Sequence, residues 1–109
     1  MTSKQQRLAT MVPGGYVVLT LKFRQEADEW VGLCEELGTA AQGRTLQEAT
    51  DILTELIELD LRTLEEMGER EKFFKKHAIR LHRHAPPRKR EKIELQHGEW
   101  AKRQLFLVA

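Results

Sequence analysis

The sequence has few of the features that mark a secreted or membrane-bound chain. Its 109 residues include a single cysteine, which excludes a disulfide framework and favours a reducing compartment. No apolar run approaches the ~20 residues that cross a bilayer, and residues 1–10 are polar, without the hydrophobic core of a signal peptide. We therefore expect a soluble, cytoplasmic, single-domain protein.

The formal net charge of +1 conceals a segregation of charge along the chain. The segments 1–25, 26–71 and 72–109 carry net charges of +4, −11 and +8. An acidic middle between basic ends can attract two kinds of partner, or a second copy of the chain. The alternative is that these charges lie on solvated faces and cancel in the folded molecule.

Three short strands are predicted in the first half of the chain. Residues 16–24 follow the turn signal at 13–15 and alternate between apolar and polar side chains, as a half-buried strand does. Two further strands are expected over 30–35 and 39–42, and the polar run 25–29 is expected to connect the first two as a hairpin. Strands so close in sequence favour an antiparallel meander.

A long amphipathic helix is predicted over residues 45–67. It begins at the capping box Thr45-Leu46-Gln47-Glu48, in which a hydroxyl and a carboxylate each satisfy an otherwise unpaired backbone N–H. Apolar residues then recur at the 3.6-residue period, interrupted only at Asp60, and Gly68 is placed to end the helix. The apolar stripe of such a helix must be covered by a sheet or by a partner.

The rest of the chain is predicted to hold a short helix over 69–77, a strand over 79–83, and a β-rich tail with a short strand at Ile93 and Leu95. The expected fold class is α+β, an antiparallel β-β-β-α-α-β module with one long helix packed on the sheet and a β-rich C-terminal tail. The expected organisation is a flexible leader over 1–12, a sheet-and-helix domain over 13–84, and a basic loop and tail over 85–109.

Two stretches resemble the HicB-like antitoxin family. They are Trp30-Val31-Gly32-Leu33-Cys34-Glu35-Glu36-Leu37-Gly38 and the helix start Gln42-Gly43-Arg44-Thr45-Leu46-Gln47-Glu48-Ala49, with Gly15-Tyr16 opening the first strand. In that family a three-stranded meander ends in a G-x-T-x-x-E-A helix start, and the helix packs on the sheet. The resemblance covers residues 14–83 and implies a partial RNase H-like fold without nuclease activity.

The resemblance also implies a protein-binding role. Family members bind and neutralise a small basic HicA-type ribonuclease toxin, and many carry a C-terminal DNA-binding domain. Only 22 residues follow Pro87, too few for a helix-turn-helix, so we expect a short, stand-alone member. The partner is expected to meet the sheet or the acidic side of the helix, whose charges would steer a cationic protein. The acidic candidates are Glu48, Asp51, Glu55 and Glu58.

No catalytic residue, cofactor or metal site is predicted, and we expect the chain not to be an enzyme. An RNase H-type nuclease holds two metal ions between converging carboxylates, but residues 16–24 contain no acid. His82 and His84 share a strand face with Arg80 but lack further metal ligands, which favours an exposed polar stripe. Cys34 is expected to be a small buried apolar residue rather than a reactive thiol.

A dense basic segment follows the short helix. Its density suits contact with a phosphate backbone, although no aromatic residue lies between Phe74 and Trp100 to stack single-stranded bases. Contact with the acidic helix of another copy is an equal alternative. The candidates for nucleic-acid contact are Lys75, Lys76, Arg80, Arg83, Arg88, Lys89 and Arg90.

The final run Leu105-Phe106-Leu107-Val108 is apolar on both faces of a strand. It is expected to pair with a second chain in a homodimer or a larger oligomer, unless it pairs within the chain's own sheet. The leading hypothesis is thus a HicB-like antitoxin module. Two alternatives stay open, a stand-alone oligomeric domain that contacts nucleic acid through its basic segment, and an orphan family member with a structural role.

Overall fold

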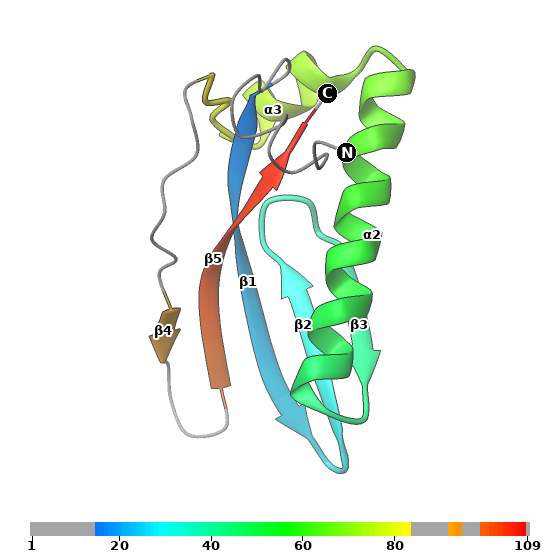
Figure 1. Cartoon of the computed structure of the whole chain (residues 1–109), viewed down its shortest axis with the longest axis vertical. Helices are drawn as coiled ribbons and strands as arrows, with labels where there is room; N and C mark the ends of the chain where they lie inside the picture. The colour runs from blue at the N-terminus through cyan, green and yellow to red at the C-terminus, as the bar shows by residue number, and fades with distance from the viewer. Residues whose placement is uncertain (1–14, 84–91, 95–98, 109) are drawn as a thin grey trace, which may run out of the picture.

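The chain folds as an α+β protein in which one long helix packs on an antiparallel sheet (Figure 1). The computed structural model describes residues 15–83, 92–94 and 99–108. The sheet has five strands in the order β3-β2-β1-β5-β4. The elements are β1 (Tyr16–Glu26), β2 (Glu29–Cys34), β3 (Ala40–Gly43), α2 (Leu46–Glu66), α3 (Arg70–Lys76), β4 (Lys92–Glu94) and β5 (Glu99–Leu107).

The hairpin between β1 and β2 is tighter than the polar run 25–29 predicts. Glu26 pairs with Glu29, so that only Ala27 and Asp28 remain in the turn. Ala27 adopts a left-handed φ of 53°, and this conformation allows a two-residue turn without the Asn-Gly signature. Both strands therefore extend further toward the turn than their apolar residues indicate.

The long helix α2 follows its predicted course. The hydroxyl of Thr45 accepts a hydrogen bond from the N–H of Glu48, and the Glu48 carboxylate accepts one from the N–H of Arg44. The apparent break in the apolar stripe at Asp60 is explained by Thr39, whose hydroxyl donates to the Asp60 carboxylate. The buried stripe of the helix is Ala49, Leu53, Ile57 and Leu61.

The core lies between α2 and one face of the sheet. Along β1, alternate side chains are buried beneath the helix, as the period-2 pattern predicts. The short helix α3 and the residues after it close one end of this core with Phe74 and Ile79. The residues that β1 contributes are Val17, Leu19, Leu21 and Phe23.

The close approach of α2 to the sheet begins at Gly43, the last residue of β3. A β-carbon at this position would lie 2.6 Å from the backbone nitrogen of Ala49, in the first turn of the helix. Only glycine allows the chain to leave β3 and enter the helix at this separation. In the G-x-T-x-x-E-A helix start, the glycine is therefore required for packing, and the threonine and glutamate for capping.

The strand predicted over 79–83 is not formed, and one β-bridge takes its place. Tyr16 and His82 exchange two backbone hydrogen bonds of 2.7 and 2.8 Å. A longer strand does not form here because little of the β1 edge is left unpaired. Its pairing with β2 ends at Leu21, and Glu35 and Glu36 bond the backbone of Thr20, so that only the first residues of β1 remain open.

The C-terminal strand β5 pairs along almost the whole of β1, from Arg24↔Glu99 to Tyr16↔Leu107. It thus lies inside the chain's own sheet, which is the alternative that the sequence left open for the final apolar run. The predicted strand at Ile93 and Leu95 is observed as β4, which pairs with β5, while Leu95 lies outside the described residues.

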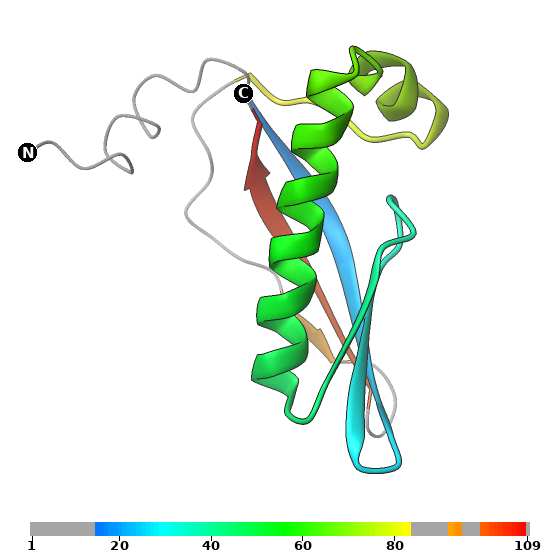
Figure 2. The same cartoon turned by 90° about the vertical axis from the view of Figure 1, so that its right-hand side faces the viewer.

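The two faces of the sheet differ in what covers them. Figure 2 shows α2 along one side of the sheet and α3 near its end. Within the described part of the chain, no helix lies over the other face, which we call the open face. No helix of the described residues is long and apolar enough to cross a membrane.

Candidate binding groove between α2 and β5

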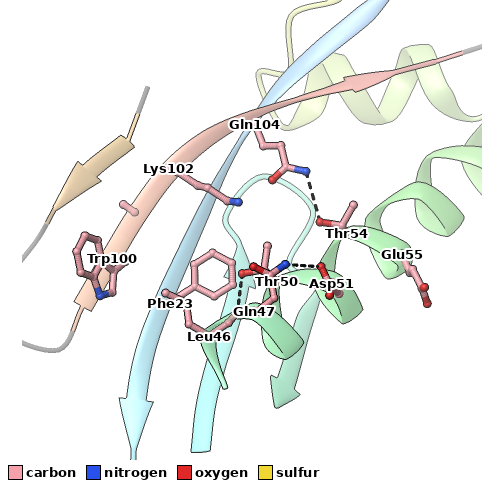
Figure 3. Close-up of a pocket in the computed structure, with 11 residues that line it drawn as sticks. Phe23, Leu46, Gln47, Thr50, Asp51, Thr54, Glu55, Trp100, Lys102 and Gln104 are labelled. Carbon is pink, nitrogen blue, oxygen red and sulfur yellow. Dashed lines mark hydrogen bonds between the residues drawn. The ribbon is translucent and has the colours of Figure 1, made fainter. Parts of the chain in front are cut away.

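A groove of about 710 Å³ lies between α2 and β5 (Figure 3). It exists because α2 lies over β2 and β3, and no helix among the described residues covers the β5 side of the same sheet face (Figure 1). The helix forms one wall with Leu46, Gln47, Thr50, Asp51, Thr54 and Glu55, and the sheet supplies Phe23, Trp100, Ala101, Lys102 and Gln104.

The helix wall of the groove is acidic. Asp51 and Glu55 line the groove, and one turn further along, Glu58 lines a smaller hollow of about 190 Å³. We call these three exposed residues the acidic row. None of them forms an ion pair with a base among residues 15–83, 92–94 and 99–108. Their spacing of four and three residues places them on one side of the helix, as the sequence predicts.

Glu48 has a different role from the other three predicted acidic candidates. It does not line the groove, and its carboxylate accepts a hydrogen bond of 3.1 Å from the N–H of Arg44 before the helix. Glu48 therefore serves to satisfy a backbone donor at the start of the helix. The candidate binding site is better described by Asp51, Glu55 and Glu58 alone.

The sheet side of the groove carries an aromatic residue and a base. Trp100 pairs with Phe23 across the strands and lies half-buried at the β4 side of the groove (Figure 3). Lys102 reaches from β5 toward α2, with its amino group 6.0 Å above the centre of the Phe23 ring. The groove is thus acidic on one wall and apolar, with one cation, on the other.

Direct hydrogen bonds order the polar side chains of the groove. The amide of Gln104 donates across it to the hydroxyl of Thr54 at 3.4 Å, and the amide of Gln47 donates to the Asp51 carboxylate at 2.8 Å. The second bond holds Asp51 along the helix surface. Sequence reasoning missed Trp100, Lys102 and Gln104, although their alternation along the tail is the signal that places them on the helix-covered face.

The predicted basic cluster is separate from this groove. Lys75 and Lys76 lie in the last turn of α3, and Arg80 and Arg83 follow it; all four side chains are exposed. Within the described part of the chain, no carboxylate lies within ion-pairing distance of them. The remaining members of the predicted set, Arg88, Lys89 and Arg90, lie outside the described residues.

Cys34 is a buried apolar residue, as predicted. Its side chain has no exposed surface, and burial raises the pKa of its thiol to about 11. The sulfur also lies 3.9 Å from a carboxylate oxygen of Glu36, which accepts the weak S–H hydrogen bond. At neutral pH the thiol is therefore protonated and a poor nucleophile.

His82 does not belong to an exposed stripe. Its ring stacks on Tyr16 with a centroid separation of 4.9 Å and an angle of 16° between the planes, and it is half-buried. The prediction that it points into solvent beside Arg80 is therefore wrong, because the β-bridge places it against the sheet. His84 lies outside the described residues, among which no three His, Cys, Asp or Glu side chains gather as a metal site requires.

The final apolar run is divided between the two faces of the sheet. Phe106 and Val108 are buried in the chain's own core, so they are not available to a second chain. Leu105 and Leu107 alternate with them and lie on the open face. Only these two members of the predicted oligomer interface are therefore placed to contact a partner.

Comparison of the chain with protein-family models, with curated proteins and with solved structures found no match.

Proposed function

We propose that the protein is a binding module that holds a basic segment of a partner protein in the groove between α2 and β5. The acidic row is the observation that carries this proposal. Two of its exposed carboxylates line the groove and the third lies one turn further along the helix, and none of the three forms an ion pair with a base among the described residues. Trp100 of the same groove is partly buried, and tryptophan is among the residues that dominate the binding energy of protein interfaces.

The resemblance to HicB-like antitoxins supports a choice of partner, a small basic HicA-type ribonuclease in the cytoplasm. The acidic row would steer such a protein toward the groove and raise the rate of encounter. Once bound, arginine or lysine side chains of the partner would pair with Asp51 and Glu55, and an apolar residue would cover Trp100. The bound module would then occupy the cationic surface along which the ribonuclease binds RNA.

Co-expression tests this function. The chain is produced together with a small basic HicA-type ribonuclease, and growth of the host is followed. The wild-type chain is expected to restore growth, and the variant Asp51→Asn/Glu55→Gln/Glu58→Gln is expected to fail at equal protein level. A second triple variant, Asp28→Asn/Glu66→Gln/Glu71→Gln, removes the same charge from exposed positions away from the groove and is expected to restore growth.

A second function is favoured by the basic surface formed by the last turn of α3 and the residues that follow it. Unlike Lys22, Arg24 and Arg70, which form ion pairs, the described bases of this surface have no acidic partner within the described ranges. Unpaired bases at this density suit contact with the phosphates of a nucleic acid. Fluorescence anisotropy of a labelled oligonucleotide tests it: binding that weakens steeply with added salt supports the function, and no binding at low salt removes it.

A further inference from the structure

Two pairs of apolar side chains lie on the open face of the sheet, one on each side of β1. On β5, Leu105 pairs with Val18 and Leu107 pairs with Tyr16. Leu107, the last residue of β5, is 38% exposed. Both leucines point away from α2, because their neighbours Phe106 and Val108 are buried beneath it.

The second pair lies on β2. Leu33 pairs with Lys22, and Val31 pairs with Arg24. Leu33 is 41% exposed. Beside these two residues the open face is hollowed by about 350 Å³, and Ala40 of the edge strand β3 completes the apolar part of the hollow. The open face therefore has a pair of leucines at one end and, at the other, a hollow with apolar residues of β2 and β3 on one side and Lys22, Arg24 and Glu99 on the other.

These two apolar pairs are placed symmetrically about Thr20. Leu105 and Leu33 lie opposite the residues two before and two after Thr20, on strands to either side of β1. Leu107 and Val31 lie opposite the residues four before and four after it. A two-fold axis that runs in the plane of the face and passes over Thr20 therefore brings each leucine pair onto the hollow of a second copy.

Two bases of the open face, beside the hollow, already have acidic partners. Lys22 pairs with Glu35, and Arg24 pairs with Glu26 at 2.9 Å. The hydrogen bond and the negative charge of Glu35 raise the pKa of Lys22, so its amino group stays protonated at neutral pH. These two bases are already neutralised, which lowers the attraction of this end of the face for a nucleic acid.

We propose that the open face binds the open face of a second copy of this chain, with Leu105 and Leu107 of each copy seated in the hollow formed by Val31, Leu33 and Ala40 of the other. The contact is isologous, since each surface supplies both the leucines and the hollow. Two sheets packed in this way are about 10 Å apart, with side chains interdigitated between them. The groove between α2 and β5 lies on the other side of each sheet and stays accessible in the dimer.

Sedimentation velocity over a range of protein concentrations tests the proposal. The wild-type chain is expected to form dimers, and Leu107→Glu or Leu33→Glu is expected to weaken the dimer by at least about 100-fold, because each buries a charge in an apolar contact. The matched control is Leu59→Glu on α2, which is 53% exposed and lies away from the open face. It is expected to leave the dimer unchanged. Circular dichroism establishes that each variant is folded.

Site-specific cross-linking tests the symmetry of the contact. Val31→Cys and Leu107→Cys chains are mixed and oxidised, and a disulfide between the two different variants is expected, because the two-fold axis brings Leu107 of one copy onto Val31 of the other. Little cross-linking of either variant alone is expected. The native Cys34 does not interfere, because it is buried. A wild-type chain that is monomeric at all concentrations overturns the proposal. A dimer that is unaffected by Leu107→Glu also overturns the proposal. So does cross-linking that occurs chiefly between residue 107 of one copy and residue 107 of the other.

Discussion

The Glu36 carboxylate accepts two hydrogen bonds from Thr20, one from its backbone N–H at 2.8 Å and one from its hydroxyl at 2.9 Å. The residues lie sixteen positions apart in the sequence and meet where β2 ends beside β1. Because β2 has already ended at Cys34, the carboxylate provides the acceptor that a neighbouring strand would otherwise offer to the N–H of Thr20. The pair joins the residues that follow β2 to the middle of β1.

Replacing Glu36 by alanine is expected to lower the free energy of unfolding by about 1–3 kcal/mol. The change leaves the half-buried backbone N–H of Thr20 without its acceptor. An unsatisfied buried donor costs more free energy than a satisfied hydrogen bond contributes. Glu36→Gln keeps one acceptor oxygen and is expected to lose less. Chemical denaturation of the three proteins measures these differences.

The neighbouring carboxylate provides the control for this prediction. Glu35 forms an exposed ion pair with Lys22, and surface pairs of this kind contribute little to stability. Glu35→Ala is therefore expected to be close to neutral. If Glu35→Ala costs as much as Glu36→Ala, the hydrogen bonds from Thr20 to Glu36 do not stabilise the sheet edge as we infer.

Gly43→Ala is expected to destabilise the chain by about 1–3 kcal/mol, the usual range for an overpacked contact. The new β-carbon would meet the backbone of Ala49 at 2.6 Å, and the helix must shift to accept it. Gly38→Ala is the comparison, because its β-carbon meets no atom within 4 Å and its cost comes only from a positive φ of 75°. Backbone amide shifts at the start of α2 should move in Gly43→Ala alone.

The buried thiol of Cys34 predicts a specific dependence of stability on pH. Its pKa is about 11 in the folded chain, raised from an ordinary value of 9.0, chiefly by burial. The folded state therefore binds the proton more tightly than the unfolded state. The resulting stabilisation is complete below pH 9 and is lost as the pH rises toward 11.

The measurement compares wild type with Cys34→Ala from pH 8 to pH 11. The stability difference between them is expected to narrow as the pH rises, because only the wild type loses the contribution of the protonated thiol. Iodoacetamide is expected to label the folded wild type far more slowly than the unfolded chain at pH 8. A constant stability difference together with rapid labelling would show that the thiol is not buried in solution.

The elements with strong local signals were predictable from the sequence. Thr45 and Glu48 mark the start of α2 by capping chemistry, and the alternation from Val17 to Phe23 identifies the buried face of β1. These signals depend on neighbours in the chain, so one sequence is enough to detect them. Asp60 was visible as an interruption of the helix stripe, but its partner Thr39 was not, because that contact spans the sheet and the helix.

The long-range pairings were not predictable from the sequence. Nothing local distinguishes a strand of residues 79–83 from the single bridge at His82, since the outcome depends on how much of the β1 edge is already occupied. The groove likewise depends on β5 lying beside β1 rather than on another chain. The sequence identified the acidic row, whereas Trp100 became part of a site only through the pairing with Phe23.

The central claim is that the acidic row beside the groove binds a basic partner protein, and calorimetry tests it most directly. A purified small basic HicA-type ribonuclease is titrated into the wild-type chain and into the two triple variants of equal charge. Binding is expected for the wild type and for Asp28→Asn/Glu66→Gln/Glu71→Gln, and is expected to weaken by at least about 30-fold for Asp51→Asn/Glu55→Gln/Glu58→Gln. Equal affinity for both triple variants, or no binding by the wild type, would contradict the claim.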